Sequence, residues 1–202
     1  MSLKKYLGTL LLLTSGTAMA AQDGWHALFQ LGYADSDYSR TKLGVNPLGG
    51  AFSARVGDKN DGLGGRLGFM YQFNEFIAME AGYTRYADVQ LTNIFGIPGF
   101  NGTLEPSAVD LTLRTMLPIR PQFKAFSKYG LAYASLNSKT SNNLGYNAKV
   151  NEDAIRPAYG LGVSYDLSEN FSAELTWMRV QQQKGKIQNQ TLTSLGVSYF
   201  LY

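Results

Sequence analysis

The sequence predicts an all-β protein, an eight-stranded antiparallel up-and-down transmembrane β-barrel. Three observations support this prediction. Apolar residues recur at every second position through eight segments, the connections between these segments are alternately short and long, and the faces opposite the apolar ones carry glycines and charges. Because successive side chains of a strand point to opposite sides, one side of each segment would contact lipid and the other a narrow lumen. The predicted strands are residues 25–36, 62–73, 76–86, 107–117, 123–136, 155–167, 171–178 and 191–202.

The first three segments show the two-residue period clearly. In the first, every second residue from Trp25 to Tyr33 is apolar, and in the second, Arg66 and several glycines lie opposite the apolar face. The third segment places Glu80 among the residues opposite its own apolar face. Two residues separate the second segment from the third, which predicts a tight hairpin turn.

The fourth and fifth segments continue the pattern. The fourth alternates leucine and valine with Asp110 and Arg114, and it ends in a proline-containing turn at residues 118–122. The fifth sets Lys128 and small residues against tyrosine and leucine. These two segments therefore form a second predicted hairpin.

The last three segments complete the predicted barrel. The sixth alternates tyrosine, leucine and valine with glycine and serine, and the seventh sets Glu174 against an apolar face. The eighth alternates apolar residues with serine and glycine and ends on an aromatic residue, as a strand that closes an outer-membrane barrel does. If Tyr199 faces lipid, Tyr202 falls on the other face.

Short and long connections lie at opposite ends of the predicted strands. Turns of two to five residues join the second and third, fourth and fifth, and sixth and seventh segments. The long polar connections are residues 37–61, 87–106, 137–153 and 181–190. In outer-membrane barrels the short turns face the periplasm and the long loops face the outside.

A secreted, soluble eight-stranded barrel of the lipocalin type is the main alternative, with its apolar faces turned inward. Charges opposite the apolar faces favour the membrane barrel, because a soluble barrel would spread its charges over the outside. Aromatic residues also gather near both ends of the segments, as the two aromatic girdles of a membrane barrel do. They are Trp25, Tyr71, Phe73, Phe76, Phe123, Tyr165, Phe171 and Tyr199 at the short-turn side, and Tyr33, Tyr83, Tyr129, Tyr133, Tyr159 and Trp177 at the loop side.

The N-terminal residues 1–20 have the features of a secretory signal peptide. Two lysines precede a short apolar run, and small residues form an A-x-A cleavage site at residues 18–20. The run is too short to span a bilayer of roughly 30 Å. We therefore expect a signal peptide over residues 1–20 and one outer-membrane barrel domain over residues 21–202.

Composition excludes several other classes. Removal of Lys4 and Lys5 lowers the 18 basic residues to 16, against 15 acidic residues, so the charge balance does not predict a nucleic-acid partner. The chain has no cysteine, which excludes a small domain held by disulfide bonds. No cluster of histidine, aspartate and glutamate has the spacing of a metal site, and we expect no cofactor.

Four parts of the sequence resemble the OmpA-like transmembrane domain family. They are the SLGVSY sequence at 194–199, the hairpin at 68–83, the strand at 109–119, and residues 162–163 followed by 172–177. The chain ends where members of that family often continue into a peptidoglycan-binding periplasmic domain, so that activity is not expected here. The resemblance implies an outer-membrane location, with lipids and lipopolysaccharide as surroundings.

Six charged residues are predicted to form a network in the lumen. Glu80, Arg114, Lys128 and Glu174 all lie four or five residues from the short turns on the inward face, while Arg66 and Asp110 would form a second layer above them. Pairing is nearly obligatory, because an unpaired charge in such a lumen costs several kcal/mol. We expect a structural plug, with a gated conduction path as the alternative.

The resemblance gives this network a partial precedent. Glu80 and Arg114 fall where the family places an acid and a base in its lumen. Glu174 and Ser164 stand where the family tends to have a base and an acid, respectively. The pairing within the network is therefore expected to differ from the family pattern.

A catalytic role of the hydrolase type would depend on the single histidine of the chain. Some small outer-membrane barrels modify lipid A, and such a hydrolase needs a base beside a hydroxyl nucleophile. His26 stands at the start of the first strand, and the sequence places no serine and acid beside it. We therefore expect no enzymatic activity.

The second long loop is unusually apolar for an exposed connection. Within residues 92–104, Ile94, Phe95, Ile97 and Phe100 lie in seven residues. Exposed apolar patches usually mark a contact, so this patch would bind a partner protein, fold over the barrel mouth or dip into the outer leaflet.

The sequence thus predicts a monomeric barrel in the cell outer membrane with a structural or surface-interaction role carried by its external loops. The alternatives are an adhesin or immune-evasion barrel using residues 92–104, a lipid A modifying enzyme, and a narrow pore. Expected partners are outer-membrane lipids and lipopolysaccharide, the barrel-assembly machinery through the C-terminal strand, and a host or envelope protein.

Overall fold

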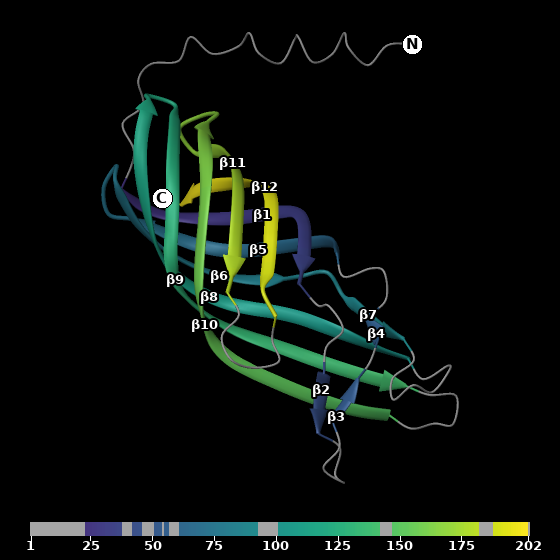
Figure 1. The fold of residues 1–202 in the computed structure, drawn as a ribbon. Helices are drawn as coiled ribbons and strands as arrows, with labels where there is room; N and C mark the ends of the chain where they lie inside the picture. Colours follow the sequence, from purple (N-terminus) through teal and green to yellow (C-terminus); the bar gives the residue numbers. More distant parts are fainter. Residues whose placement is uncertain are drawn as a thin grey trace, which may run out of the picture.

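The computed structural model describes residues 23–37, 42–45, 51–53, 55–56, 61–92, 101–141, 147–181 and 188–201. These residues form a barrel of long, tilted strands (Figure 1). The strands are β1 (Gly24–Ser36), β2 (Lys42–Val45), β3 (Ala51–Ser53), β4 (Arg55–Val56), β5 (Asp61–Gln72), β6 (Ile77–Arg85), β7 (Val89–Thr92), β8 (Asn101–Arg120), β9 (Phe123–Ser141), β10 (Asn147–Asp166), β11 (Phe171–Val180) and β12 (Gln190–Leu201).

Eight of these strands close into the predicted antiparallel barrel. Around the ring, β1, β5, β6, β8, β9, β10, β11 and β12 follow one another in chain order, and every neighbouring pair is antiparallel. The ring closes where β12 pairs with β1, from Trp25 opposite Leu201 to Ser36 opposite Gln190. The predicted fold class is confirmed, and the last strand closes the barrel as the sequence indicated. Tyr202, whose register was in question, lies outside the described residues.

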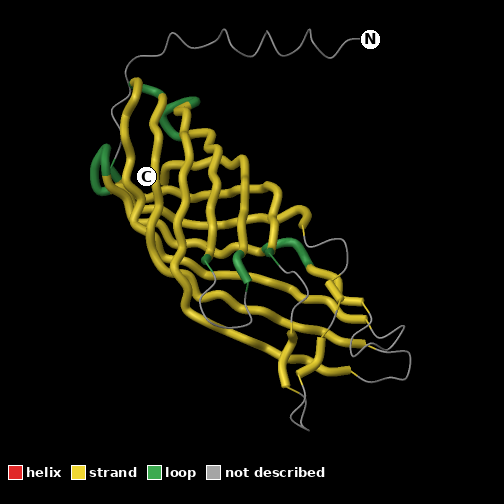
Figure 2. The backbone as a smooth tube through the Cα atoms, viewed as in Figure 1, coloured by secondary structure: helices red, strands yellow, loops and turns green. Residues whose placement is uncertain are grey.

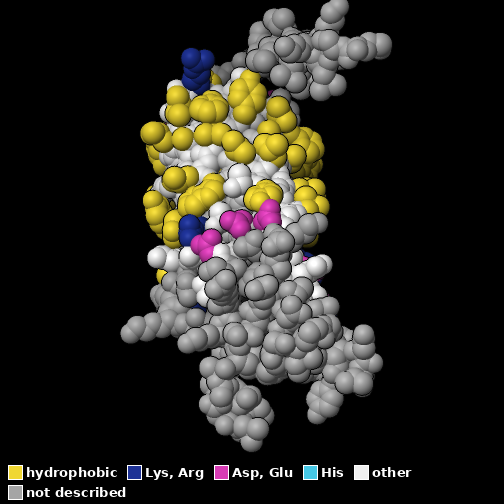
Figure 3. Space-filling view, turned by 45° about the vertical axis from the view of Figure 1, so that its right-hand side comes forward, with side chains coloured by type: hydrophobic (Ala, Val, Ile, Leu, Met, Phe, Trp, Pro, Cys, Tyr) yellow, Lys and Arg dark blue, Asp and Glu magenta, His cyan; other side chains and the backbone are white. Residues whose placement is uncertain are grey.

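Side chains alternate between lipid and lumen along every strand of the ring. In β6, each residue from Ile77 to Arg85 is in turn exposed and buried. The exposed positions carry large apolar side chains, which form rows around the barrel in Figure 3. A soluble protein would bury such side chains, whereas a bilayer solvates them. The apolar faces therefore point outward, as the membrane interpretation requires.

Aromatic rings pack against one another near the short turns. Trp25 on β1 contacts Tyr71 on β5 with ring centroids 5.1 Å apart, and Phe171 on β11 contacts Tyr199 on β12 at 4.8 Å. Figure 2 shows the short connections gathered at one end of the barrel. In the part of the chain that the structure describes, no helix has the length and hydropathy needed to cross a membrane.

Three strands are longer than the sequence predicted. The predicted loops 87–106 and 137–153 contain β7 and the outer parts of β8, β9 and β10. Figure 1 shows β8, β9 and β10 running on past the ends of the other barrel strands. Their outer parts pair in register, with Asn101 opposite Ser141 and Asn147 also opposite Ser141. We call this extension the blade, made of β7 and residues 101–106, 136–141 and 147–152.

The blade escaped prediction because its strands lie beyond the apolar belt. A lipid-facing strand reveals itself by an apolar residue at every second position, and a strand in water needs no such row.

The predicted turn at residues 118–122 is also shorter than expected, because β8 continues to Arg120 and residues 121–122 form the turn. A register shift between Pro118 and Arg120 accommodates Pro118, which has no N–H to donate.

We expect a charge on the lipid-facing wall to destabilise the barrel according to its depth. Leu113 lies midway along the apolar row of β8, and Ile155 lies near the outer end of β10, where it pairs with Tyr133. Leu113→Arg should lower the free energy of unfolding by about 2–4 kcal/mol and Ile155→Arg by about 0–1 kcal/mol. Urea unfolding in lipid vesicles measures both values. Equal losses for the two variants would contradict the assigned depth.

Candidate functional site

The six charged residues predicted for the lumen all lie inside the barrel. Their exposed fractions are 2% or less. The alternation of each strand puts them there, since every one occupies a buried position between outward-facing neighbours. They are Arg66 on β5, Glu80 on β6, Asp110 and Arg114 on β8, Lys128 on β9, and Glu174 on β11.

Glu80 is the centre of this charge network. Its Oε1 accepts from Arg66 Nη1 at 2.5 Å and from Lys128 Nζ at 2.7 Å. Its Oε2 lies 3.6 Å from Arg114 Nη1. One fully buried carboxylate thus faces three cations from three different strands.

The network extends from Glu80 in two directions. Towards the outer end, Arg66 Nη2 reaches Asp110 Oδ1 at 2.6 Å. Towards the short turns, Arg114 Nη1 reaches Glu174 Oε1 at 2.8 Å, and Glu174 also accepts from Gln30 Nε2 at 3.3 Å. Three acids and three bases are joined, so their formal charges cancel.

The two layers that the sequence suggested are one network, because Arg66 bridges them. Its guanidinium lies across Gly82, where an added Cβ would collide with it, and close to Gly68, where a Cβ would lie 3.2 Å from Nη1. The two glycines therefore make the space in which Arg66 reaches both Glu80 and Asp110. On the other side of the network, the Arg114 guanidinium stacks 3.6 Å from the ring centroid of Phe126.

Mainly apolar side chains fill the lumen on both sides of the network, and Arg156 on β10 is buried opposite Ala132 on the outer side. Along β8 the buried residues pass from Leu104 and Ala108 through Asp110 and Arg114 to Met116. The layer towards the outer end consists of Ala34, Tyr86, Ala87, Val89, Leu104, Ala108, Ala132, Ala134, Leu136, Ala158, Met178, Val180 and Leu192. The layer towards the short turns consists of Leu28, Met70, Ala78, Met116 and Phe126.

These apolar layers were missed in the sequence. Val89, Leu104 and Leu136 lie in or beside segments that were predicted as loops, and the inward alanines were counted only as small residues. The recurrence of alanine at inward positions of β9, with Ala132 followed by Ala134, is the signal that could have indicated an apolar layer. Arg156 on β10, opposite Ala132, is a buried charge at the same level.

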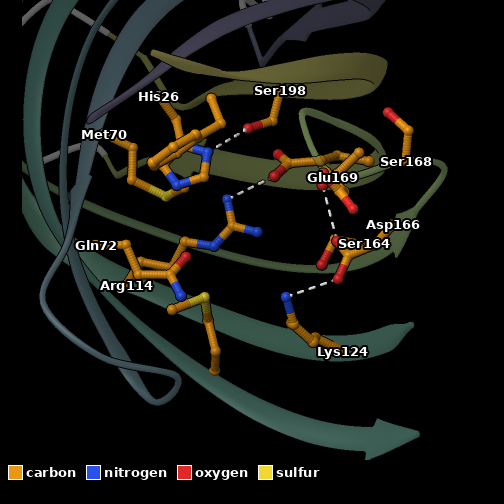
Figure 4. A pocket seen from close by; sticks show the side chains of 14 residues that line it. His26, Met70, Gln72, Arg114, Lys124, Ser164, Asp166, Ser168, Glu169 and Ser198 are labelled. Atoms are coloured by element: carbon orange, nitrogen blue, oxygen red, sulfur yellow. Dashed lines mark hydrogen bonds and ion pairs between the residues drawn. The ribbon is translucent and has the colours of Figure 1, made fainter. Parts of the chain in front are cut away.

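A small polar cavity lies below the network, at the short-turn end (Figure 4). Its volume is about 40 Å³, enough for a few water molecules. Lys124 and Asp166 form an ion pair of 2.8 Å at its edge, and His26 Nδ1 lies 3.4 Å from Ser198 Oγ. The structure thus places a serine beside His26, which the sequence alone did not.

The His26 and Ser198 pair is more widely spaced than a hydrolase pair usually is, and the cavity beside it is small. Its separation of 3.4 Å exceeds the usual hydroxyl-to-base distance of about 2.6–3.2 Å. Ser198 is buried, and the cavity beside it, of about 40 Å³, is too small for an acyl chain. Among the described residues, no group of three or more histidine, aspartate or glutamate side chains is arranged to hold a metal ion.

The structure does not describe the apolar patch that was predicted in the second long loop. Ile94, Phe95, Ile97 and Phe100 lie outside the described residues. The described strands on either side of the patch are β7 and β8, which pair with Val89 opposite Leu104. The patch therefore belongs to the connection that begins and ends in the blade.

Comparison with known families decides the classification. The model of the OmpA-like transmembrane domain matches residues 23–201, which is nearly the whole chain. The chain belongs to the OmpA-like transmembrane domain family. The resemblance inferred from the sequence is confirmed, and with it the location in the outer membrane, among lipids and lipopolysaccharide.

Individual relatives of this OmpA-like barrel are distant. A protein of Coxiella burnetii described as uncharacterized is 26% identical over 172 residues, covering 70% of this chain and 69% of its own length. Among solved structures, Neisserial surface protein A has a TM-score of 0.59 at 16% identity, covering 89% of this chain and 98% of its own. OprG of Pseudomonas aeruginosa has a TM-score of 0.59 at 13% identity, covering 90% and 99%.

A third similar structure is Ail, the attachment invasion locus protein of Yersinia pestis, solved with the heparin analogue sucrose octasulfate. Its TM-score is 0.53 at 17% identity, and the match covers 89% of this chain and all of Ail. These likenesses establish the small outer-membrane barrel as the fold.

We expect the charge network to depend on Glu80 for stability. Glu80→Gln keeps the shape of the side chain but leaves three buried cations facing two carboxylates. It should lower the free energy of unfolding by about 3–5 kcal/mol, as loss of one partner of a buried ion pair does. Urea unfolding in lipid vesicles measures this loss.

Asp88→Asn provides the control for that experiment. The Asp88 side chain is 47% exposed and pairs with Arg85 at 3.0 Å on the surface, so its loss should cost less than about 1 kcal/mol. A Glu80→Gln barrel as stable as the Asp88→Asn barrel would show that the network does not hold the lumen together.

Proposed function

We propose that this outer-membrane barrel is a closed, non-conducting anchor that carries interaction surfaces outside the cell. The observation that carries the proposal is the filled lumen, in which a closely paired charge network lies between two mainly apolar clusters of buried side chains. Ions would have to pass the paired network and the apolar side chains beside it, which is costly in a low-dielectric interior. A gated conduction path or a narrow pore is therefore disfavoured.

The blade supports the interaction half of the proposal. β8, β9 and β10 run on past the ends of the other five barrel strands, and β7 pairs with the outer part of β8 (Figure 1). Loops on a rigid scaffold are common binding elements. The blade therefore provides such a scaffold for the apolar patch at Ile94, Phe95, Ile97 and Phe100.

An adhesin is the second candidate function, and the blade is the observation that favours it. The likeness to Ail, whose name denotes attachment and invasion, is limited to the fold at 17% identity. Under this candidate the partner is a host or envelope protein, bound by the patch at the blade. A lipid A modifying enzyme is disfavoured by the long His26 to Ser198 distance and the 40 Å³ cavity.

The proposal includes the processing and assembly of the chain. Residues 1–20 would be removed as a signal peptide, and the remaining chain would insert as a monomer. Recognition by the barrel-assembly machinery would use β12, whose pairing with β1 closes the ring.

We expect the purified barrel to give no resolvable ionic current in planar lipid bilayers, because the apolar layers exclude hydrated ions. The measurement is single-channel recording at both polarities. Reproducible current steps that disappear in an Arg114→Ala variant would sink the proposal of a closed lumen, since they would locate the current in the network.

We expect shortening of the blade to abolish surface interactions without unfolding the barrel. Asn137 pairs with Asn151, so residues 138–150 can be replaced by an Asn-Gly turn with the register kept. Bacteria that display this variant should lose adherence to host-cell layers and matrix-coated wells, while the protein keeps its heat-modifiable gel migration.

A matched change at the opposite rim is the control for the shortened blade. Replacement of Pro121 and Gln122 by Asn-Gly alters the short turn between β8 and β9 and should leave adherence unchanged. If the shortened-blade variant still adheres and the Pro121–Gln122 variant does not, the interaction lies at the short-turn end of the barrel, which would contradict the proposal.

A further inference from the structure

The seam between β5 and β6 opens before these strands reach the outer rim. Their last paired residues are Gly65 and Arg85, whereas β5 stays paired with β1 as far as Asp61. The chain after β6 instead follows β8, with the Tyr86 N–H donating to the Pro106 carbonyl at 3.1 Å. Within the described residues, no strand therefore flanks residues 61–64 of β5 on the side of β6.

A groove of about 440 Å³ occupies this gap. We call it the seam notch. It is an open groove in the outer wall and not an enclosed cavity. The lining residues are Leu31, Asp61, Gly62, Leu63, Gly64, Gly65, Arg85, Tyr86, Ala87 and Asp88.

The inner part of the seam notch is apolar. Tyr86 and Ala87 belong to the outer apolar layer of the lumen and form its floor. Leu31 and Leu63 project from the lipid-facing wall beside it, and Leu63 is 79% exposed. Three glycines of β5, at positions 62, 64 and 65, line the notch without side chains.

The outer lip of the seam notch is acidic. Asp61 accepts a hydrogen bond from the Tyr33 hydroxyl, and Asp88 pairs with Arg85 at 3.0 Å. Two carboxylates against one guanidinium repel an anionic group. The part of a ligand that enters the seam notch is therefore expected to be uncharged.

The position of the seam notch identifies its occupant. It opens on the same face as Leu31 and Leu63, which is the face that contacts the bilayer. Among the described residues, the edge of β5 at residues 61–64 has no strand partner on the side of β6, and backbone N–H and C=O groups near a bilayer are most stable when they are hydrogen-bonded. A hydrocarbon chain with a carbonyl linkage matches both the apolar floor and the strand edge.

We propose that the seam notch binds the first part of an acyl chain of an outer-leaflet lipid. The hydrocarbon lies against Leu31, Leu63 and Ala87, and the ester or amide carbonyl of the chain accepts from a backbone N–H of residues 61–64 of β5. The charged head group stays outside the acidic lip. This site is independent of the lumen network and of the blade.

Nuclear magnetic resonance tests this site directly. The full barrel is perdeuterated apart from its alanine methyl groups and placed in nanodiscs of dimyristoyl phosphatidylcholine with protonated chains. A nuclear Overhauser effect between acyl methylenes and the Ala87 methyl is expected. Ala132 is the internal control, because it is buried in the same apolar layer but does not line the seam notch.

A pair of variants makes the test specific. Gly65→Leu fills the mouth of the notch, where an added Cβ would meet only the Leu31 side chain at 3.2 Å and the Gln30 carbonyl at 3.6 Å. It should lose the effect at Ala87. Ala125→Leu adds the same side chain on β9 and should keep it.

The opposite results would overturn the proposal. Water cross-peaks at Ala87 in place of acyl cross-peaks would show a hydrated notch, and an effect at Ala132 equal to that at Ala87 would show indirect transfer. An unchanged effect in a folded Gly65→Leu barrel would place the chain elsewhere. If Gly65→Leu does not fold, the comparison of Ala87 with Ala132 in the unaltered barrel still decides.

Discussion

Closure of the backbone hydrogen bonds into a ring is the constraint on which the rest of this structure depends. A bilayer offers no partner to a free strand edge, so β12 must return to β1. A ring of eight strands leaves a lumen only wide enough to be filled by side chains. Whatever faces inward must therefore pack and must be neutral overall. The charge network meets both requirements, because Glu80, Asp110 and Glu174 together balance Arg66, Arg114 and Lys128.

The layering of the lumen follows from the same constraint. Charges that cannot reach bulk water are most stable when they face one another at one level, and apolar residues can then pack above and below them. The order along β8, from Leu104 through Asp110 and Arg114 to Met116, reproduces these layers on one strand. The glycines at positions 68 and 82 matter for the same reason, because they leave the volume that the Arg66 side chain occupies. The lumen of the barrel is thus filled by side chains over most of its length.

The sequence predicted most of what lies in the bilayer and little of what lies beyond it. The period of two located all eight barrel strands and the inward position of residues such as Glu80 and Glu174, because lipid imposes that period. It did not predict the bridge made by Arg66, since the reach of a side chain depends on the glycines across from it. The blade and the seam notch were also missed. Both depend on which strands remain paired, and residues such as Gly65 and Arg85 carry no local signal of where a pairing ends.

The one-sided extension of the wall has a mechanical consequence. The six outermost residues of β9 span about 20 Å along the strand, all on one side of the barrel axis. A force applied at that tip acts on a lever arm, so it produces a torque on the barrel as well as a pull. The barrel would tilt in the bilayer before it was drawn out. A load on the blade would therefore first rotate the barrel in the bilayer. The lipid contacts of the apolar belt and its aromatic residues would resist this rotation.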